Sequence, residues 1–140
     1  MTFAAQMRVG SLEITAALLA VAVVAARPQV AAVREFARTL PMRLGLRVIE
    51  PGNERMFEAR PPLTIGRARE SGLVLSDPEV SRNHASLECD DGVVYVHDLE
   101  SSNGTFLNGR RITEPIEIRR GDEIDLGATR LVVEELAPWT

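Results

Sequence analysis

The chain has 140 residues, 45% hydrophobic and 26% charged, which is enough for one domain with its own core but not for two large ones. Sixteen basic residues against twenty acidic ones give a formal net charge of −4, which argues against a general affinity for nucleic acids or other polyanions. The single cysteine, Cys89, excludes an internal disulfide and a cysteine-cluster metal site.

The first 45 residues differ in character from the rest. They contain five arginines and two glutamates, a net charge of +3, so the remainder carries −7. The uncharged run from Ile14 to Ala26 would form a helix of about 20 Å, against roughly 30 Å of bilayer hydrocarbon. Residues 9–26 come close to the required length but include Glu13. A membrane anchor through residues 9–26 is one interpretation, and the arginines that follow the run would then leave the C-terminal domain in the cytoplasm.

A second helical pattern follows the apolar run. Four apolar residues recur at helical spacing: Val30, Val33, Ala37 and Leu40. Pro28 suits a first helical turn and Pro41 ends the pattern, so we expect a helix between them. Four alternatives stay open: this helix lies beside a membrane, binds a partner, folds on the next domain, or is never made because translation begins downstream, for example at Met42.

From residue 46 onward, short β-type runs alternate with turn residues. The expected strands are 46–50, 55–59, 63–66, 73–75, 84–89, 93–99, 105–107, 116–118, 123–126 and 130–136. Asp91-Gly92 and Asn108-Gly109 are typical hairpin turns. The pattern predicts an all-β fold, an antiparallel β-sandwich of about ten to eleven short strands over residues 46–136. A helical segment (residues 1–45) precedes it and a tail (residues 137–140) follows.

Three polar clusters lie where predicted strands meet loops. They are Gly66-Arg67, Ser81-Arg82-Asn83-His84 and Ser101-Ser102-Asn103-Gly104-Thr105. Arginines and hydroxyls are donors suited to a phosphate dianion, and an asparagine beside a glycine can hydrogen-bond an extended backbone at a sharp turn. Taken singly, each cluster is better explained as an ordinary turn or a solvated side chain.

In order and spacing, the clusters resemble the signature of the forkhead-associated (FHA) family: Gly-Arg, then Ser-Arg-x-His, then Ser/Thr-x-Asn-Gly-Thr followed by Asn-Gly. Asn108-Gly109 and Gly121-Asp122 continue the match, which covers about residues 46–136. The resemblance implies an FHA-like sandwich that binds phosphothreonine peptides.

The resemblance also implies individual roles. Arg67 would contact the phosphate or the peptide beside it, Ser81, Arg82 and Ser102 would donate to the phosphate, and Asn103 would hold the ligand backbone. A further set would support the binding loops: Gly66, His84, Gly104, Asn108 and Gly109.

The leading hypothesis is therefore a non-catalytic adaptor whose partners are phosphothreonine proteins, substrates of a Ser/Thr kinase. The alternative is a phospho-independent interaction or oligomerisation module with the same fold. No nucleophile–base pair and no metal-ligand spacing for His84 and His97 stand out, so we expect no enzyme activity, no metal and no cofactor. Glu79, two residues before Ser81, is expected to disfavour acidic ligand residues near it.

Overall fold

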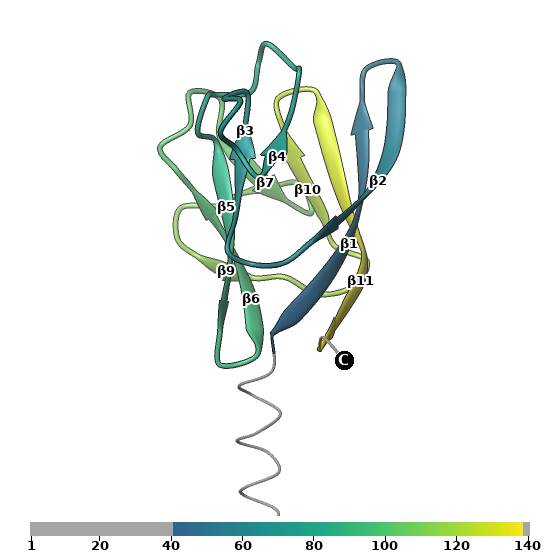
Figure 1. Cartoon of the computed structure of the whole chain (residues 1–140). Coiled ribbons are helices and arrows are strands. Elements are labelled where there is room, and N and C mark those ends of the chain that lie inside the picture. Colours follow the sequence, from purple (N-terminus) through teal and green to yellow (C-terminus); the bar gives the residue numbers. More distant parts are fainter. Residues whose placement is uncertain (1–40, 139–140) are drawn as a thin grey trace, which may run out of the picture. The chain divides into compact units, whose positions relative to one another are not determined.

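The computed structural model describes residues 41–138, which contain eleven strands (Figure 1). The strands are β1 (Met42–Glu50), β2 (Asn53–Ala59), β3 (Leu63–Gly66), β4 (Leu73–Val74), β5 (Ala85–Asp90), β6 (Val93–Asp98), β7 (Thr105–Leu107), β8 (Arg110–Arg111), β9 (Ile116–Glu117), β10 (Glu123–Leu126) and β11 (Thr129–Pro138). Sheet A has the order β2-β1-β11-β10-β7-β8 and sheet B the order β4-β3-β5-β6-β9. The predicted all-β sandwich is confirmed, although one pairing, β3 with β4, is parallel.

The N-terminal helical segment and the candidate anchor at residues 9–26 lie outside the described residues, and they stay predictions. Within residues 41–138, the structure has no helix with the length and apolar character that crossing a bilayer requires. Strand β1 begins at Met42, four residues before the predicted domain start, because Met42 pairs with Pro138 and its side chain is buried. Strand β11 correspondingly reaches Pro138, inside the predicted tail.

The core lies between the two sheets and follows the alternation of side chains along each strand. In β1 every second residue is buried, including Leu44, Leu46 and Val48, each fully inaccessible to solvent. Other strands contribute residues of the same kind: Ile65, Leu87, Val96, Ile124, Leu126, Leu131 and Val133. This packing holds the ends of β3, β5 and β6 in fixed positions.

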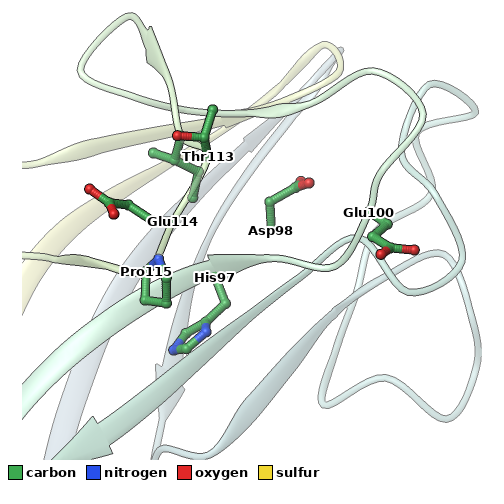
Figure 2. Close-up of a pocket in the computed structure, with 7 residues that line it drawn as sticks. His97, Asp98, Glu100, Thr113, Glu114 and Pro115 are labelled. Atoms are coloured by element: carbon green, nitrogen blue, oxygen red, sulfur yellow. The ribbon is translucent and has the colours of Figure 1, made fainter.

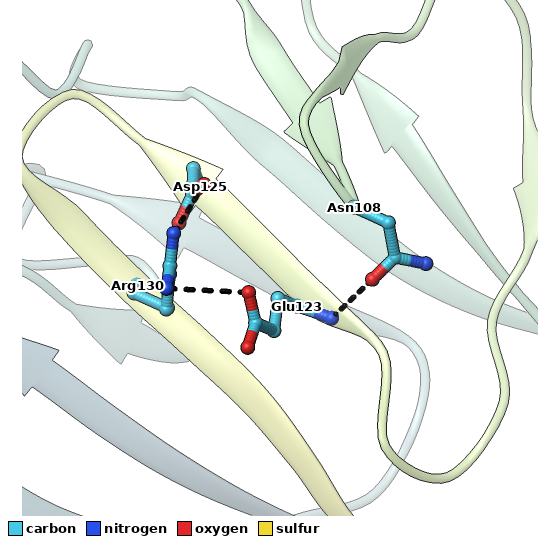
Figure 3. Close-up of polar contacts among 4 residues, drawn as sticks. All are labelled: Asn108, Glu123, Asp125 and Arg130. Carbon is cyan, nitrogen blue, oxygen red and sulfur yellow. Dashed lines mark hydrogen bonds and ion pairs between the residues drawn. The ribbon is translucent and has the colours of Figure 1, made fainter.

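Both predicted hairpin turns are confirmed. Leu107 pairs with Arg110 across Asn108-Gly109, whose φ angles of 50° and 82° are those of a tight two-residue turn. Asn108 has a second role, because its Oδ1 accepts from the Glu123 amide at 2.9 Å and its Nδ2 donates to Asp122 Oδ1 at 3.0 Å. Figure 3 shows the first of these bonds, which ties the β7–β8 turn to the start of β10.

A buried carboxylate joins the β10–β11 turn to the chain after β4. Asp77 accepts from the Glu79 amide at 2.9 Å, the Ala128 amide at 2.8 Å and Thr129 Oγ1 at 3.0 Å. Burial alone raises the pKa of Asp77, but these hydrogen bonds outweigh it and hold the pKa below its ordinary value of 3.8.

The lowered pKa predicts an acid-dependent contribution of Asp77 to stability. The contribution is fully present above pH 3.8, the ordinary value, and is lost as the pH falls through the lower folded-state pKa. We expect the free energy of unfolding, measured by urea titration from pH 6 downward, to fall less steeply with acid in Asp77→Asn than in the wild type. Asp90→Asn is the matched control, since Asp90 is exposed at the end of β5. Equal acid dependence in Asp77→Asn and the wild type would contradict this assignment.

Candidate functional site

The three polar clusters of the sequence lie at one end of the sandwich (Figure 1). Because β3 and β6 both run antiparallel to β5, the ends of β3 and β6 meet the start of β5. The segments involved are loop 67–72 after β3, loop 75–84 before β5 and loop 99–104 after β6. The fold therefore brings Arg67, Ser81, Arg82, Ser102 and Asn103 together.

Hydrogen bonds connect the three loops around Ser81. The Arg67 amide donates to the Ser81 carbonyl at 3.1 Å, and the Ser102 amide donates to Ser81 Oγ, also at 3.1 Å. Asn103 Nδ2 donates to the Glu79 carbonyl at 2.7 Å, which joins loop 99–104 to loop 75–84 again. Since Ser81 Oγ accepts from Ser102, its own hydrogen is available to donate to a ligand.

The two arginines of the cluster differ in how they are held. Arg67 donates from Nε to the Val80 carbonyl at 2.6 Å, which fixes its guanidinium beside Ser81 and leaves the terminal nitrogens available. Arg82 is exposed. Among residues 41–138, neither guanidinium forms an ion pair with a carboxylate.

His84 lies beneath these loops and is completely buried. Its Nδ1 accepts from the Ser81 amide at 3.0 Å, and its Nε2 lies 2.9 Å from the Gly104 carbonyl. An amide can only donate and a carbonyl can only accept, so the neutral tautomer with the proton on Nε2 satisfies both partners. One imidazole therefore links loop 75–84 to loop 99–104.

Asp98, at the end of β6, is a second, partly buried acceptor that sequence reasoning did not place in the site. Its Oδ1 accepts from Ser101 Oγ at 2.5 Å and Thr105 Oγ1 at 2.7 Å, so it spans the base of loop 99–104. Burial raises the pKa of Asp98, but these hydrogen bonds outweigh it and lower the pKa below its ordinary value. The signal available in the sequence was local, because an aspartate three residues before a serine often caps a loop in this way.

His97 and Asp98 are adjacent at the end of β6 but have different partners. They leave opposite sides of β6 (Figure 2), and His97 Nε2 lies 3.4 Å from Glu88 Oε2. A hollow of about 200 Å³ lies beside them, lined partly by Glu100 and Glu114. Across residues 41–138, no three His, Cys, Asp or Glu side chains are grouped so that they could hold a metal ion.

The supporting residues predicted from the sequence fall in two places. Gly66 and Gly104 lie at the loop cluster: a Cβ on Gly66 would overlap the Arg82 carbonyl, and Gly104 has a φ of 85°. Asn108 and Gly109 instead lie beyond β7, tied to β10 and not to the three loops. Support of the loops by Asn108-Gly109 is thus at most indirect, through β7.

The close approach at Gly66 predicts a strong effect of its substitution. Gly66→Ala forces β3 and loop 75–84 apart, so we expect a loss of about 1–3 kcal/mol in the free energy of unfolding, measured with denaturant. Gly45→Ala is the control, since the nearest atom to an added Cβ there is a side-chain Cβ at 3.2 Å. A loss in Gly66→Ala no larger than in Gly45→Ala would contradict the argument.

Comparison with known proteins identifies relatives over the same region. The family model of the FHA domain matches residues 63–127. An oxoglutarate dehydrogenase inhibitor from Corynebacterium diphtheriae is 37% identical over 100 residues, which cover 69% of this chain and 69% of that protein. Vacuolar protein sorting-associated protein 64 from Saccharomyces cerevisiae is 37% identical over 89 residues, covering 61% of this chain but only 15% of the yeast protein.

A solved structure supports the same assignment. The yeast Dun1 FHA domain, determined in complex with a doubly phosphorylated phosphothreonine peptide derived from Rad53, matches with a TM-score of 0.57 and 30% identity. The match covers 73% of this chain and 78% of that one. With the eleven-stranded sandwich and the loop cluster around Ser81, these similarities show that the chain belongs to the FHA domain family.

Proposed function

We propose that this chain binds proteins that carry phosphothreonine and acts as a non-catalytic adaptor in Ser/Thr kinase signalling. The main support is that hydrogen-bond donors from three loops converge around Ser81. In addition, no carboxylate among residues 41–138 forms an ion pair with Arg67 or Arg82. A phosphothreonine brings a charge close to −2 and three strong acceptor oxygens, which a cluster of donors whose arginines have no carboxylate partner within residues 41–138 can match.

Each side chain has a proposed role that its contacts support. Arg67, already fixed by Val80, presents its terminal nitrogens to the phosphate or the adjacent peptide, and Ser81 donates its free hydroxyl hydrogen. Arg82 and Ser102 are exposed beside them and add further donors. Asn103 uses Nδ2 for the Glu79 carbonyl, which leaves Oδ1 to accept from the backbone of an extended ligand.

The supporting residues give this site its shape before a ligand arrives. His84 fixes Ser81 relative to Gly104, and Gly66 allows Arg67 to lie against loop 75–84. Such preorganisation reduces the conformational entropy lost on binding. The yeast Dun1 domain, whose structure contains a phosphothreonine peptide, supports the same ligand class for this chain.

Calorimetric titration with matched peptides tests the proposal. One peptide sequence is prepared with phosphothreonine, phosphoserine or threonine, drawn from a library with varied flanking residues. We expect binding only to the phosphorylated forms, and loss of about 1.5–3 kcal/mol in Arg67→Ala, which is roughly a 10- to 150-fold weaker Kd. Arg119→Ala is the control, because its side chain is 79% exposed on the segment before β10.

Two outcomes would reject this function. Absence of phosphate-dependent binding by the wild type rejects it directly. Equal affinity for the phosphorylated and unphosphorylated peptides favours the alternative, a phospho-independent interaction module.

A further inference from the structure

A hollow of about 300 Å³ adjoins the proposed phosphate site on the side of loop 67–72. Arg67, Ala68, Arg69, Glu70 and Arg82 line it. Three guanidinium groups and one carboxylate give this hollow a formal charge of +2, in a chain whose net charge is −4. A local excess of this sign favours anionic ligand groups.

The arginines of the hollow differ from those on the outer face of sheet A. On that face Arg130 contacts Asp125 at 2.8 Å and Glu123 at 3.2 Å (Figure 3), and Arg47 contacts Glu134 at 2.8 Å. Within the described part of the chain, Arg69 and Arg82 have no such partner, and Glu70 is not close enough to form an ion pair with them. Within residues 41–138, the net positive charge of the hollow is therefore not neutralised by ion pairs.

The backbone contacts order these groups across the end of the sandwich. On one side of Ser81, the Ala68 amide donates to the Arg82 carbonyl at 3.1 Å, which places loop 67–72 against it. On the other side, the Glu79 carbonyl accepts from Asn103, and an added Cβ on Gly127 would lie 2.8 Å from Glu79 Cβ. Arg69 and Glu79 therefore have different neighbours, loop 67–72 packed on Arg82 and the β10–β11 turn at Gly127, and a peptide that crosses at Ser81 is expected to meet arginine in one direction and glutamate in the other.

We propose that Arg69 binds a second anionic group of the same ligand, on the side of the phosphothreonine away from Glu79. The inference rests on the proposed function, because a phosphate already held by Arg67 and Ser81 leaves Arg69 unpaired. The hollow shares Arg67 and Arg82 with the phosphate site, and an extended peptide advances about 3.4 Å per residue. The second anion therefore lies within about one to three residues of the phosphothreonine.

A carboxylate and a second phosphate are both anions that could bind in this hollow. The experiment is therefore designed to distinguish between them. Each phosphothreonine peptide carries one test residue, which is glutamate, glutamine or phosphoserine. This residue is placed in turn at each of the three positions before and the three positions after the phosphothreonine. Kd values are measured for the wild-type chain and Arg69→Gln, with Arg110→Gln as the control because Arg110 is exposed in β8 and does not line the hollow. The quantity compared is the ratio of Kd values for the glutamine and acidic peptides.

For the wild type we expect glutamate on one side of the phosphothreonine to strengthen binding about two- to tenfold over glutamine, and phosphoserine by a similar or larger factor. Arg69→Gln should bring this ratio close to one, while Arg110→Gln should retain it. A larger factor for phosphoserine identifies a second phosphate as the preferred group, and equal factors identify anionic charge alone.

The two proposals can fail separately. A wild-type protein that binds the glutamine phosphothreonine peptide but shows no acidic preference, or keeps its preference in Arg69→Gln, overturns the role of Arg69 and leaves the proposed function standing. No binding of any phosphothreonine peptide overturns both.

Discussion

The geometry of the loop cluster depends on the two hydrogen bonds that the imidazole of His84 forms. His84 is fully buried and joins Ser81 to Gly104, which are 23 positions apart in the chain, through its two ring nitrogens. Its backbone adds two further links, donating to Ile65 and accepting from Leu99. Without the ring, the partly buried Ser81 amide and the buried Gly104 carbonyl would lose their partners, and the loss of a buried partner costs about 1–3 kcal/mol.

The charged residues of the described region fall into groups with different roles. Asp77 and Asp98 use their carboxylate oxygens to hold loops from within, and the carboxylates on sheet A pair with arginines of the same face. The arginines at the loop end lack such partners within residues 41–138. The net charge of −4 for the whole chain therefore does not indicate the charge of the surface that a phosphopeptide would meet.

Much of the fold could be predicted from the sequence because its signals are local. The strand expected at residues 93–99 and the Asn108-Gly109 turn depend on residues close together in the chain, and both were confirmed. The hydrogen bonds of Asp77 could not be predicted, since two of its donors, Ala128 and Thr129, lie more than fifty positions away in the chain. The start of β1 at Met42 was missed for the same reason, because it is set by pairing with Pro138.

The candidate site shows the same division. The spacing of three motifs was sufficient to name the residues that converge, but the neutral tautomer of His84 and the fixed Nε of Arg67 follow only from contacts between loops. Arg69 had no motif at all to mark it. Arg69 stands out only by comparison, because other arginines form ion pairs with carboxylates and Arg69 forms none within residues 41–138.

The position of β2 at the outer edge of sheet A bears on how copies of this protein behave toward one another. An edge strand with unpaired backbone groups can recruit a second copy, and Met56, 62% exposed at its centre, would add apolar contact. An antiparallel pairing of two β2 strands about Met56 places Glu54 of each opposite Glu58 of the other. Like charges directly opposite in a sheet repel, so the strand that ends sheet A also discourages the sheet from growing.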